Sequence, residues 1–254
     1  MPSITWHIQV YKDEEYLPEC LSALRRSYPD SRIFLISDGD PNPKIEQIAN
    51  QFGSECFYGE RLFGIEHGGE ILHRLLDYYL NRPSDYLIKI DGDTLVNRRI
   101  LYLPITKRPL LMGTRQVAGD GEEDLVSVQG GCIILNHAAA SLMHESKLFL
   151  DPRLKPPDIA WARKGTHQEE RAMLGLTSHD WTIGWVCKEL NIEIWDHPEI
   201  ASYWKEKAFY SLSDVARNYR MLIRRFWPAV THPNKIAAPV DSSQEGAERQ
   251  QKSG

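Results

Sequence analysis

The chain has 254 residues, 42% of them hydrophobic and 26% charged, with a formal net charge of -5 at pH 7. This composition is typical of a folded globular protein, and the acidic balance argues against a nucleic-acid partner. The four cysteines form no CxxC pair and no zinc-type Cys/His cluster, so reduced thiols in a cytoplasmic protein are expected.

The sequence shows neither a signal-peptide pattern nor a run of about 20 apolar residues, which a bilayer span requires. We therefore expect a cytoplasmic location, in which any membrane contact is peripheral and at the inner face.

The first ninety residues alternate between strand and helix patterns. Ile4, Trp6, Ile8 and Val10 recur at every second position, which is typical of a half-buried strand. Further strands are predicted at 32–37, 55–58 and 85–90, and helices after Asp13, through 45–48 and through 71–79. Such alternation indicates a mostly parallel α/β sheet, in which ligands bind beyond the carboxyl ends of the strands.

The second half of the chain is less regular. Its predicted elements are strands near 109–114 and 125–135, a helix from about 138, a polar loop or lid over 151–177, a helix over 178–190 and a strand at 192–195. The last residues, 238–254, are polar and almost free of large apolar side chains. They are expected to form a disordered tail.

Asp91, Gly92 and Asp93 directly follow the apolar strand at 85–90. In extended chain the side chains of residues i and i+2 point the same way, so both carboxylates can hold one Mn²⁺ or Mg²⁺. Such an ion keeps open positions for the oxygens of a diphosphate. The alternative is an ordinary solvated turn, because Asp and Gly are favoured turn residues.

Two further carboxylates have a functional and a structural interpretation. Asp38 ends a predicted strand, where a carboxylate can accept hydrogen bonds from a nucleoside, or can simply cap a turn. Asp180 lies in the first turn of a predicted helix. There it can deprotonate an attacking hydroxyl, or can simply stabilise the helix dipole.

Five segments follow one another in an order that resembles a known family. They are IQVYKDEEYLPECLSAL, LISDGDPNP, DYLIKIDGDTLV, VQGGCIILN and SHDWTIGWVCKELNIEI. Their succession is similar to that of the nucleotide-sugar glycosyltransferases of the GT-A fold, most of all to the inverting family 2 enzymes. The resemblance implies an α/β fold with a Rossmann-like, mostly parallel central sheet flanked by helices.

The resemblance implies a role for each matching position. Asp180 would be the general base, and Asp93 would hold a metal ion, Mn²⁺ or Mg²⁺, on the donor diphosphate. Donor contacts are implied or proposed for Val10, Tyr11, Asp38, Gly68, Gly69 and Asp91. The acceptor side would include Gln129, Gly130, Gly131 and Trp181. Asp91 and a late histidine, His197, are candidates to complete the metal shell.

The resemblance also implies a domain plan. We expect one GT-A catalytic domain over 1–237, followed by the tail at 238–254. Within it, 1–104 would bind the nucleotide sugar, 105–210 would face the acceptor, and 211–230 would form a C-terminal amphipathic helix. The expected partners are a nucleoside-diphosphate sugar, with a UDP-sugar favoured, and a hydroxyl acceptor that is a glycan or is lipid-linked.

Several alternatives stay open. His179 stands where the family has the Glu of its Glu-Asp pair, which keeps a non-catalytic nucleotide-sugar-binding module in play. A retaining GT-A glycosyltransferase is a further alternative, because Asp180 is assigned by resemblance. The stretch 212–227 has an apolar stripe opposite three arginines, so it either packs on its own domain or lies on anionic lipid.

Overall fold

The structure of the chain is a computed structural model that describes residues 2–11, 13–39, 41–62, 67–118, 125–154, 179–202 and 227–232. The strands are β1 (Ile4–Val10), β2 (Arg32–Asp38), β3 (Glu55–Gly59), β4 (Tyr86–Asp91), β5 (Leu95–Val96), β6 (Leu110–Ala118), β7 (Leu125–Asn136), β8 (Glu193–Asp196), β9 (Ile200–Ser202) and β10 (Val230–His232). The helices are α1 (Leu17–Ser27), α2 (Pro43–Gln51), α3 (Gly68–Leu80), α4 (His137–Ser146) and α6 (His179–Glu189), with short 3-10 turns η1 (Leu148–Leu150) and η2 (Pro152–Leu154).

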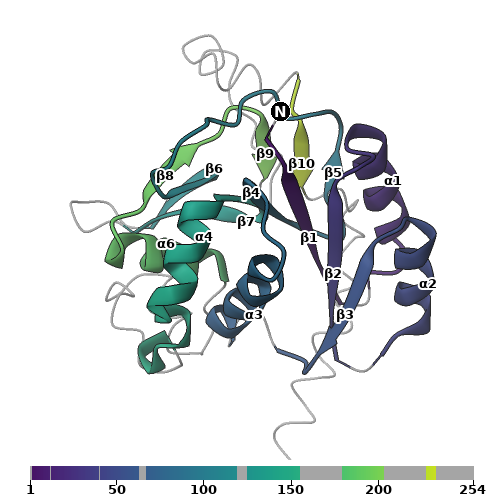
Figure 1. Cartoon of the computed structure of the whole chain (residues 1–254), viewed down its shortest axis with the longest axis horizontal. Helices are drawn as coiled ribbons and strands as arrows, with labels where there is room; N and C mark the ends of the chain where they lie inside the picture. The colour runs from purple at the N-terminus through teal and green to yellow at the C-terminus, as the bar shows by residue number, and fades with distance from the viewer. Residues whose placement is uncertain are drawn as a thin grey trace, which may run out of the picture.

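The strands form a central sheet and a small second sheet (Figure 1). The central sheet has seven strands in the order β3-β2-β1-β4-β7-β6-β8, and the small one has the order β5-β10-β9. Strands β1 to β4 run parallel to one another, β7 is antiparallel to both β4 and β6, and β8 is parallel to β6. The predicted mostly parallel sheet is therefore confirmed.

Helices cover both faces of the central sheet, α1 and α2 on one side and α3, α4 and α6 on the other (Figure 1). Each side has its own apolar core. One core joins α1 and α2 to side chains such as Trp6, Ile8 and Ile90, and the other joins α3, α4 and α6 to side chains such as Phe34 and Leu87. Because β1, β2 and β4 are parallel neighbours, their carboxyl ends lie at the same edge of the sheet.

Strand β1 is buried on both faces, although its alternation predicts a half-buried strand. Trp6 and Ile8 face the α1 core, as expected, but Thr5 and His7 are also buried. His7 packs against Phe34, with ring centroids 5.0 Å apart. The prediction of a solvated face was wrong because parallel strands in an α/β sheet have helices on both sides.

Helix α1 begins later than a cap at Asp13 would place it. The helix begins at Leu17 with Pro18 in its first turn, where a missing N–H costs nothing. The Asp13 carboxylate instead accepts a hydrogen bond from the backbone N–H of Tyr11 at 3.0 Å. Asp13 therefore shapes the loop that leaves β1.

Several predictions fall on residues outside the described ranges. These include most of the loop at 151–177, most of the amphipathic helix at 211–230, whose stretch 212–227 was expected either to pack on its own domain or to lie on lipid, and the tail at 238–254. The described end of the predicted helix is not helical, since Val230 begins strand β10. Among the described helices, none has the length and apolar character needed to cross a membrane.

Candidate donor and metal site

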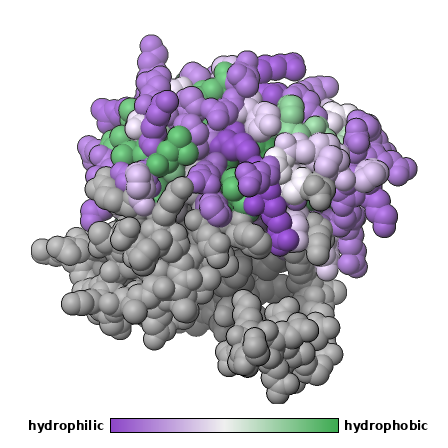
Figure 2. Space-filling view, turned by 90° about the horizontal axis from the view of Figure 1, so that it is seen from below, coloured by the Kyte–Doolittle hydropathy of each residue, from purple (hydrophilic) through white to green (hydrophobic). Residues whose placement is uncertain are grey.

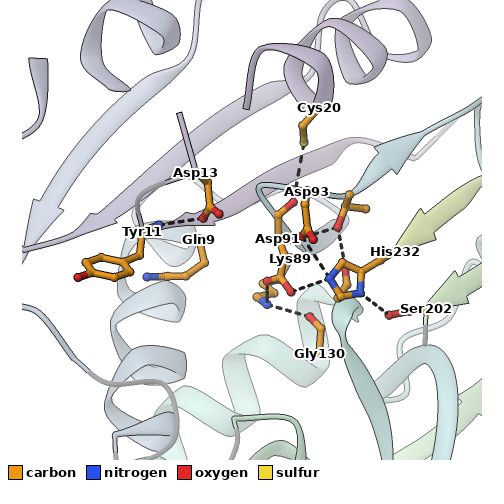
Figure 3. Close-up of polar contacts among 12 residues, drawn as sticks. Gln9, Tyr11, Asp13, Cys20, Lys89, Asp91, Asp93, Gly130, Ser202 and His232 are labelled. Carbon is orange, nitrogen blue, oxygen red and sulfur yellow. Dashed lines mark hydrogen bonds and ion pairs between the residues drawn. The ribbon is translucent and has the colours of Figure 1, made fainter. Parts of the chain in front are cut away.

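Asp91, Asp93 and His232 form a cluster at the carboxyl end of β4 (Figure 3). His232 Nε2 lies 3.3 Å from Asp91 Oδ2 and 3.3 Å from Asp93 Oδ1. One ligand atom from each residue lies within 4.8 Å of the others. Two carboxylates and an imidazole are donors that suit a divalent cation such as Mn²⁺, so the residues fit the expected metal ion.

The local backbone explains how the two carboxylates come together. The buried strand β4 ends at Asp91, and a turn follows in which Thr94 N–H donates to Asp91 C=O at 3.1 Å. Asp93 is 6% exposed, so its carboxylate is directed inward. Burial raises the pKa of the nearby Cys20 thiol, and the negative charges of Asp93 and Asp91 raise it further. The electrostatic potential at this corner is therefore negative. A cation is favoured here.

Strand β10 supplies the histidine. It pairs antiparallel with β5, which directly follows the Asp93 turn, and parallel with β9. A buried ion pair between Arg98 and Glu199 holds this region, and Arg98 also lies over the Trp227 ring at 3.7 Å. Gly131 on β7 leaves space for the ring of His232, because a Cβ at that position would collide with it. Elements that are far apart in the sequence thus place His232 beside Asp91 and Asp93.

Lys89 links the Asp91, Asp93 and His232 cluster to strand β7. Lys89 is 2% exposed, and its ammonium forms an ion pair with Asp91 Oδ1 and donates to the C=O of Gly130 at 2.8 Å. The other oxygen of Asp91 faces His232. Lys89 therefore orients the carboxylate with one oxygen toward the cluster, and no motif in the sequence singled out this lysine.

The predicted nucleoside contacts Tyr11 and Asp38 line two adjoining cavities. One, of about 770 Å³, lies beyond the ends of β2 and β3 and also includes Tyr58. The other, of about 200 Å³, extends toward Lys89 beneath α3. Arg61 lies over the Tyr11 ring at 4.1 Å from its centroid. The molecular face toward which β1 to β3 point is mostly hydrophilic over its described part (Figure 2).

Asp38 is nearly buried between these cavities. Gln9 donates to its Oδ2 at 2.7 Å, and Arg74 forms an ion pair with Oδ1. Burial raises the pKa of Asp38, and the contacts of Arg74 and Gln9 act in the opposite direction. Asp38 is thus part of the polar lining of the two cavities and does not simply cap a solvated turn. Val10, by contrast, is fully buried in the α1 core, so its main chain alone is available to a donor.

Gly68 and Gly69 begin α3. A Cβ at Gly69 would collide with the C=O of Phe149, so the absence of a side chain there has a packing explanation. Gly68 is buried, and the helix that follows lines the smaller cavity through Ile71 and Leu72. The first turns of α3 thus lie beside Tyr11 and Asp38, which line the same cavity.

Asp180 opens α6 and is held in place by two donors. Gln116 Nε2 donates to Oδ2 at 3.0 Å, and Trp181 N–H donates to Oδ1 at 3.1 Å. Gln129 donates to Gln116 at 2.6 Å. Gln129 and Gly130 are neighbours on β7, and Gly130 accepts the hydrogen bond from Lys89. Strand β7 therefore joins Asp180 to the Asp91, Asp93 and His232 cluster. Trp181 itself is partly buried against the core.

The structure does not bring His197 into the cluster. Its Nε2 contacts the C=O of Tyr102 at 2.7 Å, and its Nδ1 accepts from the N–H of Glu199 at 3.2 Å. The histidine beside the two carboxylates is His232. In β10, Val230 and His232 are buried, and Thr231 between them is partly exposed.

No family model matches the chain, and no curated protein matches it in sequence. Several solved structures are similar to it in fold. The glycosyltransferase GlyE of Streptococcus pneumoniae TIGR4 superposes with a TM-score of 0.53 at 12% identity, covering 94% of this chain, which spans 56% of that structure. The galactosyltransferase LgtC, in complex with donor and acceptor sugar analogs, gives 0.50 at 14% identity, covering 98% and 94%. Mouse xyloside xylosyltransferase 1 gives 0.50 at 11% identity, covering 91% and 98%.

These similarities establish the fold. The chain has the GT-A architecture, with a mostly parallel central sheet between helices, as the sequence predicts. At sequence identities of 11–14% the structural similarity supports a conclusion about the fold and none about the activity. The chemistry has to be argued from the site.

Proposed function

We propose that this protein is a metal-dependent glycosyltransferase that moves a sugar from a nucleoside-diphosphate sugar to a hydroxyl acceptor. The observation that carries the proposal is the Asp91, Asp93 and His232 cluster at the carboxyl edge of a GT-A sheet, beside two cavities of suitable size. The proposed donor is a UDP-sugar, bound with its nucleoside near Tyr11 and Asp38.

Mn²⁺ or Mg²⁺ would be held by the three clustered side chains. When bound, such an ion neutralises charge that develops on a departing diphosphate. The chain itself prepares this site: Lys89 fixes the orientation of Asp91, and Gly131 admits the imidazole of His232. The buried surroundings of Asp93 strengthen its attraction for a cation.

We assign Asp180 to the acceptor side as the general base, which implies inversion at the anomeric carbon. Its carboxylate is oriented by Gln116 and by the N–H of Trp181. These two contacts fix the position of the carboxylate, and a positioned carboxylate is what proton abstraction from a hydroxyl requires. The acceptor would lie along β7, near Gln129 and Gly130.

The donor site is tested by thermal unfolding with UDP, GDP, TDP and CDP, each with Mn²⁺, Mg²⁺ or EDTA. A nucleotide present at about 100 times its Kd stabilises by about 2.7 kcal/mol, or roughly 5–10 °C in Tm for a chain of this size. We expect this shift for one nucleotide, only with metal, and its loss in Asp93→Asn. Asp30→Asn, at the opposite edge of the sheet, is the matched control. No shift with any nucleotide would contradict the proposal.

The catalytic assignment is tested separately, with product analysis by NMR. Asp180→Asn is expected to abolish transfer while the metal-dependent nucleotide shift stays intact. An inverted anomeric product supports the base role, whereas a retained product would overturn that role and leave the transferase assignment standing. Nucleotide binding without hydrolysis or transfer, over a broad acceptor panel, would favour a non-catalytic binding module instead.

A further inference from the structure

A second cluster of potential metal ligands lies between α3 and α4. His73 and Asp77 are one turn apart on α3, and His144 lies opposite them in the last turn of α4. His144 Nε2 is 2.6 Å from Asp77 Oδ1. The rings of His73 and His144 are nearly parallel, at 6°, with centroids 4.8 Å apart.

The ion pair between Asp77 and His144 does not account for the ring of His73. Its Nδ1 is buried and has no hydrogen-bond partner among the described residues. A buried ring nitrogen without a partner normally costs stability, so such groups call for a missing ligand, ion or water. A neutral imidazole nitrogen is a common metal ligand.

We propose that His73, Asp77 and His144 bind a divalent transition-metal ion of the zinc type, independently of the donor site. Two imidazoles and one carboxylate favour Zn²⁺, Ni²⁺ or Cu²⁺, whereas the two carboxylates and single imidazole at Asp91 suit Mn²⁺ or Mg²⁺. The two clusters therefore differ in the ion that each prefers.

The ligand atoms are already close to one another. They lie within 4.8 Å of one another, while tetrahedral zinc with bonds of about 2.1 Å needs ligands roughly 3.4 Å apart. Binding of the ion would therefore have to bring them closer by up to about 1.4 Å. The side chain of Asp77 is 53% exposed and that of His144 is 29% exposed, so an ion has access from solvent.

The bound ion would connect α3 to α4. The same α3 lines the smaller cavity through Ile71, Leu72 and Leu75, in the turns around His73. An ion at this position would therefore stiffen a wall of that cavity, and it would do so whatever ligand the cavity takes.

The test is zinc titration by calorimetry on the full chain, free of any histidine tag. His232→Ala serves as the background, since it weakens the other cluster. We expect one zinc equivalent to remain in this background. Adding His73→Ala or His144→Ala should weaken that equivalent on the order of 10- to 100-fold, the range seen when support of a metal site is removed. Adding His137→Ala, an exposed histidine at the start of α4, should change nothing.

Thermal unfolding provides the second readout. Zinc should raise the Tm of the His232→Ala protein and of its His137→Ala derivative, but not that of the His73→Ala derivative. Mn²⁺ should not substitute for zinc in this effect. Zinc binding of unchanged affinity and stoichiometry in both the His73→Ala and His144→Ala derivatives would overturn the proposal. So would the absence of any zinc equivalent in a folded His232→Ala protein.

Discussion

The imidazole ring of His232 occupies the space that a side chain at position 131 would need. A Cβ on Gly131 would collide with three ring atoms of that histidine. Gly131 belongs to β7, which pairs with β4, whereas His232 comes from the separate small sheet. The missing side chain is therefore what allows the two sheets to meet at the carboxylates.

Gly131→Ala is expected to displace His232 and to weaken Mn²⁺ binding on the order of tenfold, the lower end of what disturbed metal sites lose. Calorimetric titration with Mn²⁺ measures this. The effect should run through the histidine, so Gly131→Ala should add nothing in a His232→Ala background. A further loss in the double variant would show that Gly131 acts through another contact.

The two late histidines should respond differently to substitution. His232→Ala removes a ligand, and it should lower Mn²⁺ affinity on the order of 10-fold or more with little loss of Tm. His197→Ala leaves the C=O of Tyr102 and the N–H of Glu199 without their partner, so it should cost about 1–3 kcal/mol of stability and leave Mn²⁺ affinity unchanged. Urea unfolding and metal titration of both variants check this. Loss of metal binding in His197→Ala alone would reverse our assignment.

Asp38 should give the parent protein a distinctive pH dependence. Burial raises its pKa above 3.8 in the folded state, so between 3.8 and the folded pKa the folded protein binds more protons than the unfolded chain. The free energy of unfolding then falls as the pH rises through this window. Subtracting the free energy of unfolding of Asp38→Asn from that of the parent protein at each pH isolates the contribution of Asp38.

Urea unfolding at a series of pH values from about 3.5 to 7 provides both curves. The difference between parent and Asp38→Asn should decrease with rising pH and become level above the folded pKa. An increase instead would mean that the ion pair with Arg74 outweighs burial. A level difference throughout would mean that the two effects cancel.

Gly69→Ala should act on stability rather than on ligand binding. The new methyl group would meet the C=O of Phe149, and overpacking of this kind costs about 1–3 kcal/mol. Nucleotide affinity, measured on folded protein below its Tm, should be close to that of the parent. A selective loss of affinity with an unchanged Tm would instead support the donor contact that the sequence suggests for Gly69.

Much of the fold and two of the three residues in the Asp91, Asp93 and His232 cluster follow from local sequence. An apolar run followed by Asp-Gly-Asp predicts both the strand β4 and the two carboxylates at its end. Alternating strands and helices predict which strand ends share an edge. These inferences succeed because the period of a strand and the direction of a parallel sheet leave few choices.

The third ligand depends on tertiary structure that no local pattern encodes. Strand β10 has only three residues and owes its position to β5, β9 and the Arg98–Glu199 ion pair. His197 has an equally plausible sequence context, beside Asp196 and a proline, and the structure alone shows that its ring nitrogens are engaged. Lys89 was overlooked although the sequence carries a signal for it: residues i and i+2 of an extended strand point the same way, which places Lys89 on the side of Asp91.

The origin of the three ligands also couples ion binding to strand docking. Two come from the end of β4, and the third comes from a three-residue strand that few backbone hydrogen bonds retain. An ion held by all three would act as an additional bond between the two sheets. Detachment of β10 and release of the ion would then be a single thermodynamic event, so the metal concentration would set how often this strand leaves its place.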